Sequence, residues 1–479
     1  ELEKAETHYL EKYRSLTVET PDEKINHMMN NWVKKQVDFC IVGKKGVRDN
    51  LQIAVGLLNY RQETAKKEIL ECLRHQFRDG HGVLTWYPYD DTRYSDQPFW
   101  IIWAVCQLIK ETGDFSILDL EIEWQDGGKA AVLDHVKAAV NRLLQDKGKH
   151  GLVRIYFADW NDALDMAWEK GESVAFTCAY AGNLKDIADC LKHMEEKTGI
   201  SKIEMAEEME CLLAEGTELY ESPDRKQKLL DEYTSLCEHN VKGGMILVST
   251  EQIRKNLVEK AEWLMQHIRE KEWISAGDDM GWFNGYYDNH GNAVEYSKKD
   301  EVRMMLTGQV FAVMSKTAGE EQVKEICRSA DKFLFDQKAG GYRLNTDFKE
   351  EKFDLGRMFG FAYGEKENGA VFSHMTVMYA NALYQRGFIR EGHKVLQTLL
   401  EAAMNFENSK MYPGLPEYFD NEGRGLYAYL DGERIFSRKK QVAAPGEMEQ
   451  IKLKKEQLLS ILEGKQKQDK HELVIQVEE

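Results

Sequence analysis

The chain has 479 residues, of which 42% are hydrophobic and 10% aromatic, so it can bury a sizeable core and is not expected to be globally disordered. Its formal net charge of −18 argues against nucleic acid as a partner, because most of the surface would repel a polyanion. No apolar run is long enough to span a membrane, so we expect neither a membrane segment nor a membrane partner.

Eight cysteines are scattered along the chain without a CxxC motif or close histidine partners. We expect them to be reduced core residues of a cytoplasmic protein, with no metal site and no disulfide framework. The amino terminus does not read as a signal peptide and lacks an initiator methionine, so we expect the chain to be a trimmed piece of a longer protein.

Residues 1–35 predict one or two polar amphipathic linker helices, and helical periodicity dominates the chain that follows. Strand signals are few, at Leu152–Phe157 and Gly340–Arg343. Residues 433–479 are dense in Lys, Glu and Gln and predict a charged tail with at most one short amphipathic helix. The expected helices lie near residues 50–60, 64–77, 98–111, 132–144, 184–191, 203–219, 225–237, 250–270, 302–317, 320–335, 375–386 and 395–404.

Short and long loops alternate between these helices, which indicates paired antiparallel helices. The long loops carry the aromatic and acidic clusters, and loops on a rigid scaffold are where sites usually lie. A closed toroid of helix hairpins collects such loops on one face, so the expected fold is all-α, an (α/α)6 barrel over residues 36–432. A superhelical helix-repeat array is the alternative, although no repeat of fixed period supports it.

The most informative stretch is Asp159-Trp160-Asn161-Asp162, which follows the apolar run at residues 152–157. A flat aromatic side chain stacks on a sugar ring, amide and carboxylate groups bind hydroxyls, and one carboxyl can be kept protonated as an acid. The alternative is that Asp162 only caps a helix continuing through residues 164–166. The stretch is therefore a candidate sugar site whose interpretation depends on its surroundings.

Five segments in the same order together resemble glycoside hydrolase family 94, the inverting disaccharide phosphorylases such as cellobiose and chitobiose phosphorylase. The resemblance covers about residues 25–432 and implies the catalytic (α/α)6 barrel of that family. The segments are Gly46–Gln52, Trp86–Trp100, Asp159–Asp162 with Gly171–Val174, Glu367–His374, and Gly425–Leu430.

The resemblance implies inverting phosphorolysis of a β-linked gluco-disaccharide or oligosaccharide to an α-sugar 1-phosphate. Asp162 would protonate the glycosidic oxygen while inorganic phosphate, a co-substrate rather than a cofactor, attacks the anomeric carbon from the opposite face. Because phosphate is already an anionic nucleophile, the second carboxylate of an inverting hydrolase is not needed. We expect burial and the neighbouring Asp159 to raise the pKa of Asp162 and keep it protonated near neutrality.

The same resemblance implies a set of binding residues. Three of them keep a structural alternative: Arg48 and Asp49 could form only an ion pair, and Asp96 could cap the helix that begins near Pro98. His374 is expected to bind phosphate as a cation or as a hydrogen-bond donor. The expected sugar-binding residues are Arg48, Asp49, Asp96, Asp159, Trp160 and, near the acceptor, Glu367.

The chain departs from the family pattern on the phosphate side. Where the family has an arginine before its R-D pair, this chain has Lys44 and Lys45, which we expect to bind phosphate as point charges. Where the family has a Thr-Gly pair, it has Asp431 and Gly432, and Gly432 keeps the phosphate-binding position.

Two alternatives stay open: a barrel that binds β-glucans without phosphorolysis, or an inverting β-glycoside hydrolase in which a loop carboxylate such as Glu367 activates water. Homodimers are frequent in the resembled family, so a homodimer is compatible with this sequence.

Overall fold

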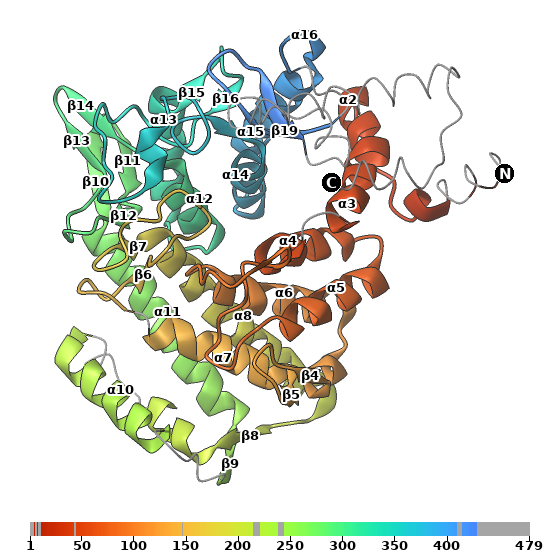
Figure 1. The fold of residues 1–479 in the computed structure, drawn as a ribbon, viewed down its shortest axis with the longest axis vertical. Coiled ribbons are helices and arrows are strands. Elements are labelled where there is room, and N and C mark those ends of the chain that lie inside the picture. The colour runs from red at the N-terminus through yellow and green to blue at the C-terminus, as the bar shows by residue number, and fades with distance from the viewer. Residues whose placement is uncertain are drawn as a thin grey trace.

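A computed structural model describes Lys4, Thr7 and residues 11–42, 45–145, 147–213, 221–237, 244–409 and 414–428. Helices dominate these residues, and the strands form only small sheets of two or three members. Figure 1 shows the helices arranged around a centre, with the small sheets at their ends.

Consecutive inner helices pack against one another: α4 on α6, α6 on α8, α8 on α12, and α12 on α14. Their surfaces are apolar around much of the helix, as α12 illustrates by burying every residue of its first eight. A helix that is apolar on all sides must be covered on all sides, which places these helices inside. The inner helices of the described residues are α4 (Val47–Leu57), α6 (Gln97–Thr112), α8 (Val174–Thr198), α12 (Leu306–Met314) and α14 (Ser373–Gln385).

An outer helix follows each inner helix and packs on it, so the described residues contain five helix hairpins. Outer helices bury one stripe only; α13 buries Val323, Ile326 and Ala330 and turns its acidic first turn to solvent. This alternation is that of the expected all-α, (α/α)6 architecture, of which the described residues show five hairpins. The outer helices are α5 (Gln62–Arg74), α7 (Val132–Gln145), α11 (Thr250–Lys271), α13 (Glu320–Phe333) and α15 (Ile389–Met404).

Because each pair of neighbouring inner helices is separated along the chain by an outer helix, the inner helices run in the same direction. Their amino ends therefore meet at one end of the barrel. Short strands lead directly into three of them: β1 (Lys45–Gly46) into α4, β7 (Glu172–Ser173) into α8, and β17 (Val371–Phe372) into α14.

Each of these lead-in strands pairs antiparallel with strands from distant loops, which fixes the loops at this end. The three sheets have the orders β1-β2-β3, β12-β7-β6 and β17-β18-β19. Their remaining strands are β2 (Thr85–Tyr87), β3 (Tyr89–Asp90), β6 (Val153–Arg154), β12 (Tyr286–Tyr287), β18 (Pro416–Phe419) and β19 (Gly425–Ala428).

Helix α3 (Val33–Val42) and the β17-β18-β19 sheet lie between α14 and α4. The side-chain amide of Gln36 donates to the Leu415 carbonyl and accepts from the Leu415 backbone N–H, both at 2.9 Å. Strand β18 also packs on α14, and α3 on α4. Before α3, the chain forms α2 (Glu23–His27) and a π-helical turn at Met28–Trp32.

Peripheral segments complete the described residues. Figure 1 shows α10 (Pro223–Cys237) at the edge of the molecule, where it packs on the 3₁₀ turn that follows strand β8. The others are α16 (Phe406–Ser409), 3₁₀ turns at Phe115–Asp119, Glu207–Leu213 and Arg357–Gly360, and strands β4 (Glu121–Glu123), β5 (Lys129–Ala131), β8 (Lys202–Ala206), β9 (Met245–Ser249), β10 (Trp273–Gly277), β11 (Met280–Phe283), β13 (Tyr296–Lys298), β14 (Glu301–Arg303), β15 (Phe335–Asp336) and β16 (Gly341–Tyr342).

Two secondary-structure predictions are wrong. The helix expected near 203–219 begins instead as strand β8, because residues 202–206 pair along their whole length with β9, more than forty residues further along the chain. The strand expected at Leu152–Phe157 is reduced to Val153–Arg154, because Tyr156 adopts a φ of 46° that ends the extended chain. The predicted tail at 433–479 lies outside the described residues.

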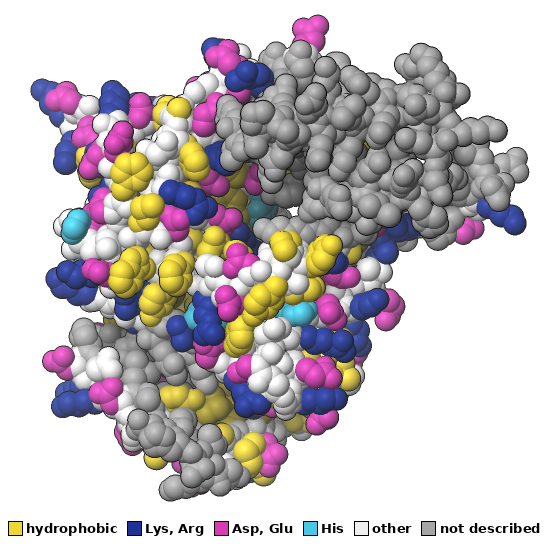
Figure 2. Space-filling view, in the orientation of Figure 1, with side chains coloured by type: hydrophobic (Ala, Val, Ile, Leu, Met, Phe, Trp, Pro, Cys, Tyr) yellow, Lys and Arg dark blue, Asp and Glu magenta, His cyan; other side chains and the backbone are white. Residues whose placement is uncertain are grey.

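Figure 2 shows acidic and basic side chains interspersed over the face that it presents, with hydrophobic groups between them. None of the helices in the described part of the chain combines the length and the hydropathy that a membrane crossing requires.

Candidate active site

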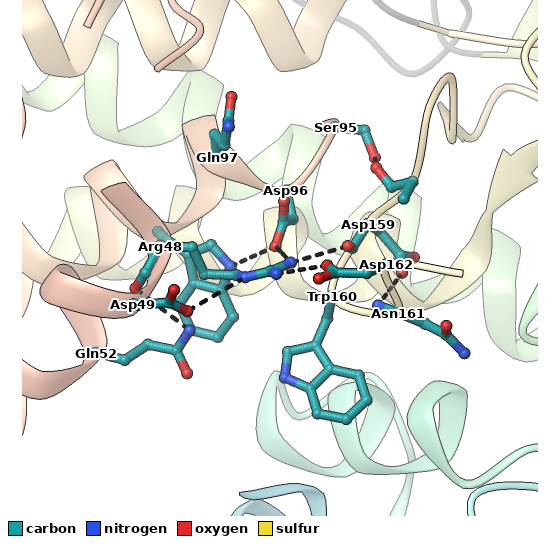
Figure 3. Close-up of polar contacts among 12 residues, drawn as sticks. Arg48, Asp49, Gln52, Ser95, Asp96, Gln97, Asp159, Trp160, Asn161 and Asp162 are labelled. Carbon is teal, nitrogen blue, oxygen red and sulfur yellow. Dashed lines mark hydrogen bonds and ion pairs between the residues drawn. The ribbon is translucent and has the colours of Figure 1, made fainter. Parts of the chain in front are cut away.

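Arg48, in the first turn of α4, connects the amino ends of two inner helices to the D-W-N-D loop. Its Nη1 donates to Asp96 Oδ2 at 3.1 Å and to the Asp159 carbonyl at 3.0 Å, and its Nη2 donates to Asp162 Oδ1 at 2.5 Å. Figure 3 shows the guanidinium among these three acceptors. Asp49 lies further away, 3.9 Å from Arg48 Nε, and its side chain is 55% exposed. The Arg48–Asp49 pair is therefore the weakest of these contacts, and the Asp49 carboxylate is accessible to a ligand.

Asp96 occupies the residue before α6 but does not cap that helix with its side chain. The carboxylate is fully buried, and Oδ2 accepts from Trp100 Nε1 at 2.8 Å as well as from Arg48. Burial raises the pKa of Asp96, against the opposing charge of Arg48. Its Oδ1 is buried and has no hydrogen-bond partner among the described residues.

Asp162 lies in a loop of turns between β6 and β7, so the helix-cap interpretation is wrong. The expected burial of this carboxyl is also wrong: its side chain is 40% exposed and is paired with Arg48. The loop turns the side chain toward Arg48 and solvent.

Asp159 has the burial that we expected of Asp162. Its carboxylate accepts from the Asn161 backbone N–H at 3.0 Å, Ser173 Oγ at 2.9 Å and the Tyr286 hydroxyl at 3.4 Å. Burial raises the pKa of Asp159 to about 7 against these donors. The carboxylate therefore faces protein groups and supports the loop from within.

Trp160 and His374 bring α14 to the site. The indole Nε1 of Trp160 donates to His374 Nδ1 at 3.0 Å. The protein packed around the His374 ring, and then the charge of Arg48, lower its pKa to about 4, although one side of the residue is exposed to solvent. His374 is therefore neutral near pH 7, which leaves the hydrogen-bond donor of the two expected forms. Because Nδ1 accepts a hydrogen bond, the proton of the neutral ring belongs on Nε2, which is a donor.

Of the remaining expected residues, Glu367 lies near Asp162 and Lys45 does not. Burial, with a further contribution from the negative charge of Asp162, raises the pKa of Glu367, so the two carboxyls lie near each other. Lys45 pairs instead with Glu68 of α5, with Nζ 3.4 Å from Oε2, and is not brought to Asp162. Lys44 and Gly432 lie outside the described residues.

Other residues at the site were not predicted. The Tyr94 ring lies 5.6 Å from Arg48 Cζ, and burial followed by the charge of Asp162 raises the pKa of Tyr94 to about 12. Tyr94 and Ser173 belong to the quoted motifs, so the motifs themselves were the available signal. Tyr286, in strand β12, and Arg357, in the 3₁₀ turn at Arg357–Gly360, lie outside the quoted motifs and had no such signal. Among the described residues, no group of three or more His, Cys, Asp or Glu side chains is arranged to hold a metal ion.

The fold and this end of the barrel define the class of (α/α)6 carbohydrate-active proteins: an arginine and a histidine of the inner helices meet the carboxyls and the tryptophan of the D-W-N-D loop. The model of the Glycosyl hydrolase 94 superfamily, catalytic domain, matches residues 8–221 and 235–411, and the chain belongs to this family. Family membership confirms the resemblance found in the sequence.

Several curated relatives are phosphorylases by name. The chain is 31% identical over 366 residues to solabiose phosphorylase of Paenibacillus borealis, covering 75% of this chain and 40% of the relative. It is 24% identical over 410 residues to N,N'-diacetylchitobiose phosphorylase of Vibrio proteolyticus, covering 77% and 44%. It is 23% identical over 450 residues to cellobionic acid phosphorylase of Neurospora crassa, covering 90% and 48%. The chain thus spans less than half the length of these relatives.

Solved structures are similar at lower identity. A GH63 mannosylglycerate hydrolase from Thermus thermophilus in complex with glucose superposes with a TM-score of 0.44 at 13% identity, covering 82% of this chain and 95% of that chain. An uncharacterized conserved protein from the same organism has a TM-score of 0.46 at 12% identity, with the same coverage.

Proposed function

We propose that the chain is the catalytic barrel of an inverting disaccharide phosphorylase. The observation that carries this proposal is the pairing of Arg48 with the partly exposed carboxyl of Asp162 beside the amino ends of the inner helices. The named activities of the curated relatives support phosphorolysis in general. We propose a β-linked gluco-disaccharide or oligosaccharide as substrate and an α-sugar 1-phosphate as product.

The proposed reaction transfers one glycosyl group to phosphate. Arg48 and Asp49 hold hydroxyls of the non-reducing sugar, and Asp162 gives its proton to the glycosidic oxygen. A phosphate oxygen attacks the anomeric carbon from the opposite face, and the electrons of the breaking C–O bond pass to the departing acceptor. The acceptor leaves as an alcohol carrying the proton of Asp162, and the configuration at the anomeric carbon is inverted.

Phosphate is proposed to bind where the amino ends of α4, α6, α8 and α14 meet. Helix amino ends carry partial positive charge and free N–H groups, which favour an anion. The neutral His374 contributes its Nε2–H as a donor. Lys44 and Gly432, outside the described residues, stay expected phosphate ligands, whereas Lys45 would first have to leave Glu68.

The bound sugar is also proposed to change the contacts of the acid. Asp162 Oδ1 is paired with Arg48 Nη2 at 2.5 Å. We propose that sugar hydroxyls replace this contact, so that the Asp162 carboxyl can face the glycosidic oxygen.

A hydrolase is less well supported. It would need an ionised carboxylate to activate water, and burial raises the pKa of Glu367, the nearby candidate. The other alternative is a barrel that binds β-glucans without turning them over, and stable binding without product would identify it.

The test of this assignment is the Asp162→Asn variant. Asparagine keeps the size of the side chain but cannot donate the proton, so turnover of unactivated disaccharides with phosphate should fall at least about 100-fold. A dinitrophenyl β-glucoside, whose leaving group needs no proton, should retain most of its turnover.

The matched control is Asp300→Asn, in the exposed turn between β13 and β14, which should leave both rates unchanged. Full disaccharide turnover by the Asp162→Asn variant would show that Asp162 is not the acid.

A further inference from the structure

Residues Leu355–Met358 run beside the segment that follows Asp162. The Met358 N–H donates to the Ala163 carbonyl at 3.0 Å, and the Met166 N–H donates to the Leu355 carbonyl at 3.2 Å. These backbone contacts join two segments almost two hundred residues apart in the chain. We call Leu355–Met358 the strap.

The two segments approach so closely at position 356 that only glycine fits there. A Cβ atom added to Gly356 would lie 2.0 Å from the Ala163 carbonyl oxygen and 2.6 Å from the Leu164 Cα. Both of these atoms are backbone atoms that cannot move aside as a flexible side chain would. The strap therefore packs in close backbone contact with the loop that carries Asp162, which we call the acid loop.

Arg357 adds the ionic contact of the strap. Its backbone N–H donates to Asp165 Oδ1 at 3.0 Å, and its Nη1 donates to Asp165 Oδ2, so both carboxylate oxygens are held. The Arg357 side chain is 46% exposed and that of Asp165 20% exposed. Asp165 is three residues after the acid, in a loop with neither helix nor strand, so contacts of this kind determine where the loop lies.

The guanidinium of Arg357 also lies near the acid site itself. Asp165 raises the pKa of Arg357 against the effect of burial, and the charges of Tyr94 and Glu367 add to this. Both Tyr94 and Glu367 in turn feel the charge of Asp162. The strap thus borders the same small region as the acid.

We propose that Arg357 is a positioning residue for the general acid: it holds Asp165 and thereby fixes the loop that carries Asp162. This inference rests on the proposed function of Asp162. Arg357 takes no proton and forms no bond in the reaction. A displacement of a reacting group by about 1 Å can cost on the order of 100-fold in rate, so the effect of losing the contact is measurable.

The inference predicts a loss that depends on the leaving group. In Arg357→Ala, kcat for phosphorolysis of the disaccharide should fall roughly 100-fold while KM changes only a few-fold. Phosphate-dependent turnover of the dinitrophenyl β-glucoside should stay nearly unchanged, because its departure needs no proton. Asp165→Asn should give the same pattern with a smaller loss.

The matched control is Arg328→Ala. Arg328 is an exposed arginine on α13 that also donates to a loop carbonyl, that of Asp279, at 2.6 Å. It should leave both rates unchanged. Thermal unfolding of each variant shows whether the chain remains folded.

The possible failures can be told apart. If the unchanged chain turns over both substrates but Arg357→Ala loses both rates equally, Arg357 is merely structural and the inference is overturned. An Arg357→Ala variant with unchanged rates on both substrates overturns it as well. If the unchanged chain forms no sugar 1-phosphate from either substrate, the proposed function fails and the inference falls with it.

Discussion

Arg48 faces more negative charge than its single positive charge neutralises. Asp162, Asp96 and Asp49 all lie within 4 Å of its guanidinium nitrogens. Asp96 is fully buried, so one of these carboxyls cannot disperse its charge into water. Burial accordingly raises the pKa of Asp96, and protonation of this carboxyl would relieve part of the excess negative charge around Arg48.

The raised pKa of Asp159 predicts how the stability of the protein depends on pH. Its pKa is about 7 in the folded chain and about 4 in an unfolded one, so the folded state binds more protons between these pH values. Stability contributed by this group therefore falls as the pH rises from about 4 to about 7. Asp159→Asn should remove that fall, so the stability of the variant relative to the unchanged chain should increase by up to about 4 kcal/mol over this window.

Urea unfolding at a series of pH values measures this difference. The asparagine amide meets the donors of Asn161 and Ser173, which adds a constant cost at every pH, so the slope against pH is compared rather than the offset. Parallel curves for the two proteins would show that Asp159 does not titrate in this range.

Site residues could be predicted from the sequence where they belong to a recognisable motif. The motifs named Arg48, Asp96, Trp160 and His374, and the structure brings these side chains together through Arg48 and Trp160. Sequence reasoning failed to distinguish the two aspartates of the D-W-N-D stretch, because burial depends on partners from distant segments. Tyr286, which covers Asp159, is more than a hundred residues away in the chain.

At the scale of elements, helices were predictable and loops were not. An outer helix such as α13 buries a single stripe, and periodicity reports that stripe directly. Strand β8 depends on pairing with β9, and the acid loop depends on the strap, so neither has a local pattern to read. The expected barrel followed from the helices, whereas the position of each site loop required the structure.

Gly356→Ala tests the fit of the strap. The added methyl group meets backbone atoms of the acid loop, so we expect a loss of about 1 to 3 kcal/mol in stability and a lower kcat on the disaccharide. Thermal unfolding and phosphorolysis rates measure the two effects.

The matched control is Gly56→Ala within helix α4, where an added Cβ meets nothing within 4 Å. Alanine is favoured over glycine in a helix, so this variant should gain up to about 1 kcal/mol. Equal stability of the two variants would contradict the close fit of the strap.

At the scale of the whole molecule, parallel inner helices explain why residues from distant parts of the sequence share one site. Arg48, Asp96, Ser173 and His374 each lie at the amino end of a different inner helix. One end of the barrel thus collects backbone N–H groups, one arginine and several carboxyls, a combination suited to a sugar and an anion. The expected homodimer and the boundaries at residues 35 and 432 stay predictions.

The most direct measurement of the central claim is the phosphate dependence of product formation. The 479-residue chain is incubated with solabiose, cellobiose, N,N'-diacetylchitobiose or cellobionic acid, with and without inorganic phosphate, and the products are followed by NMR. We predict a sugar 1-phosphate of α configuration that forms only when phosphate is present. Free sugar released at the same rate without phosphate, or stable binding of these sugars without any product, would contradict the proposed phosphorolysis.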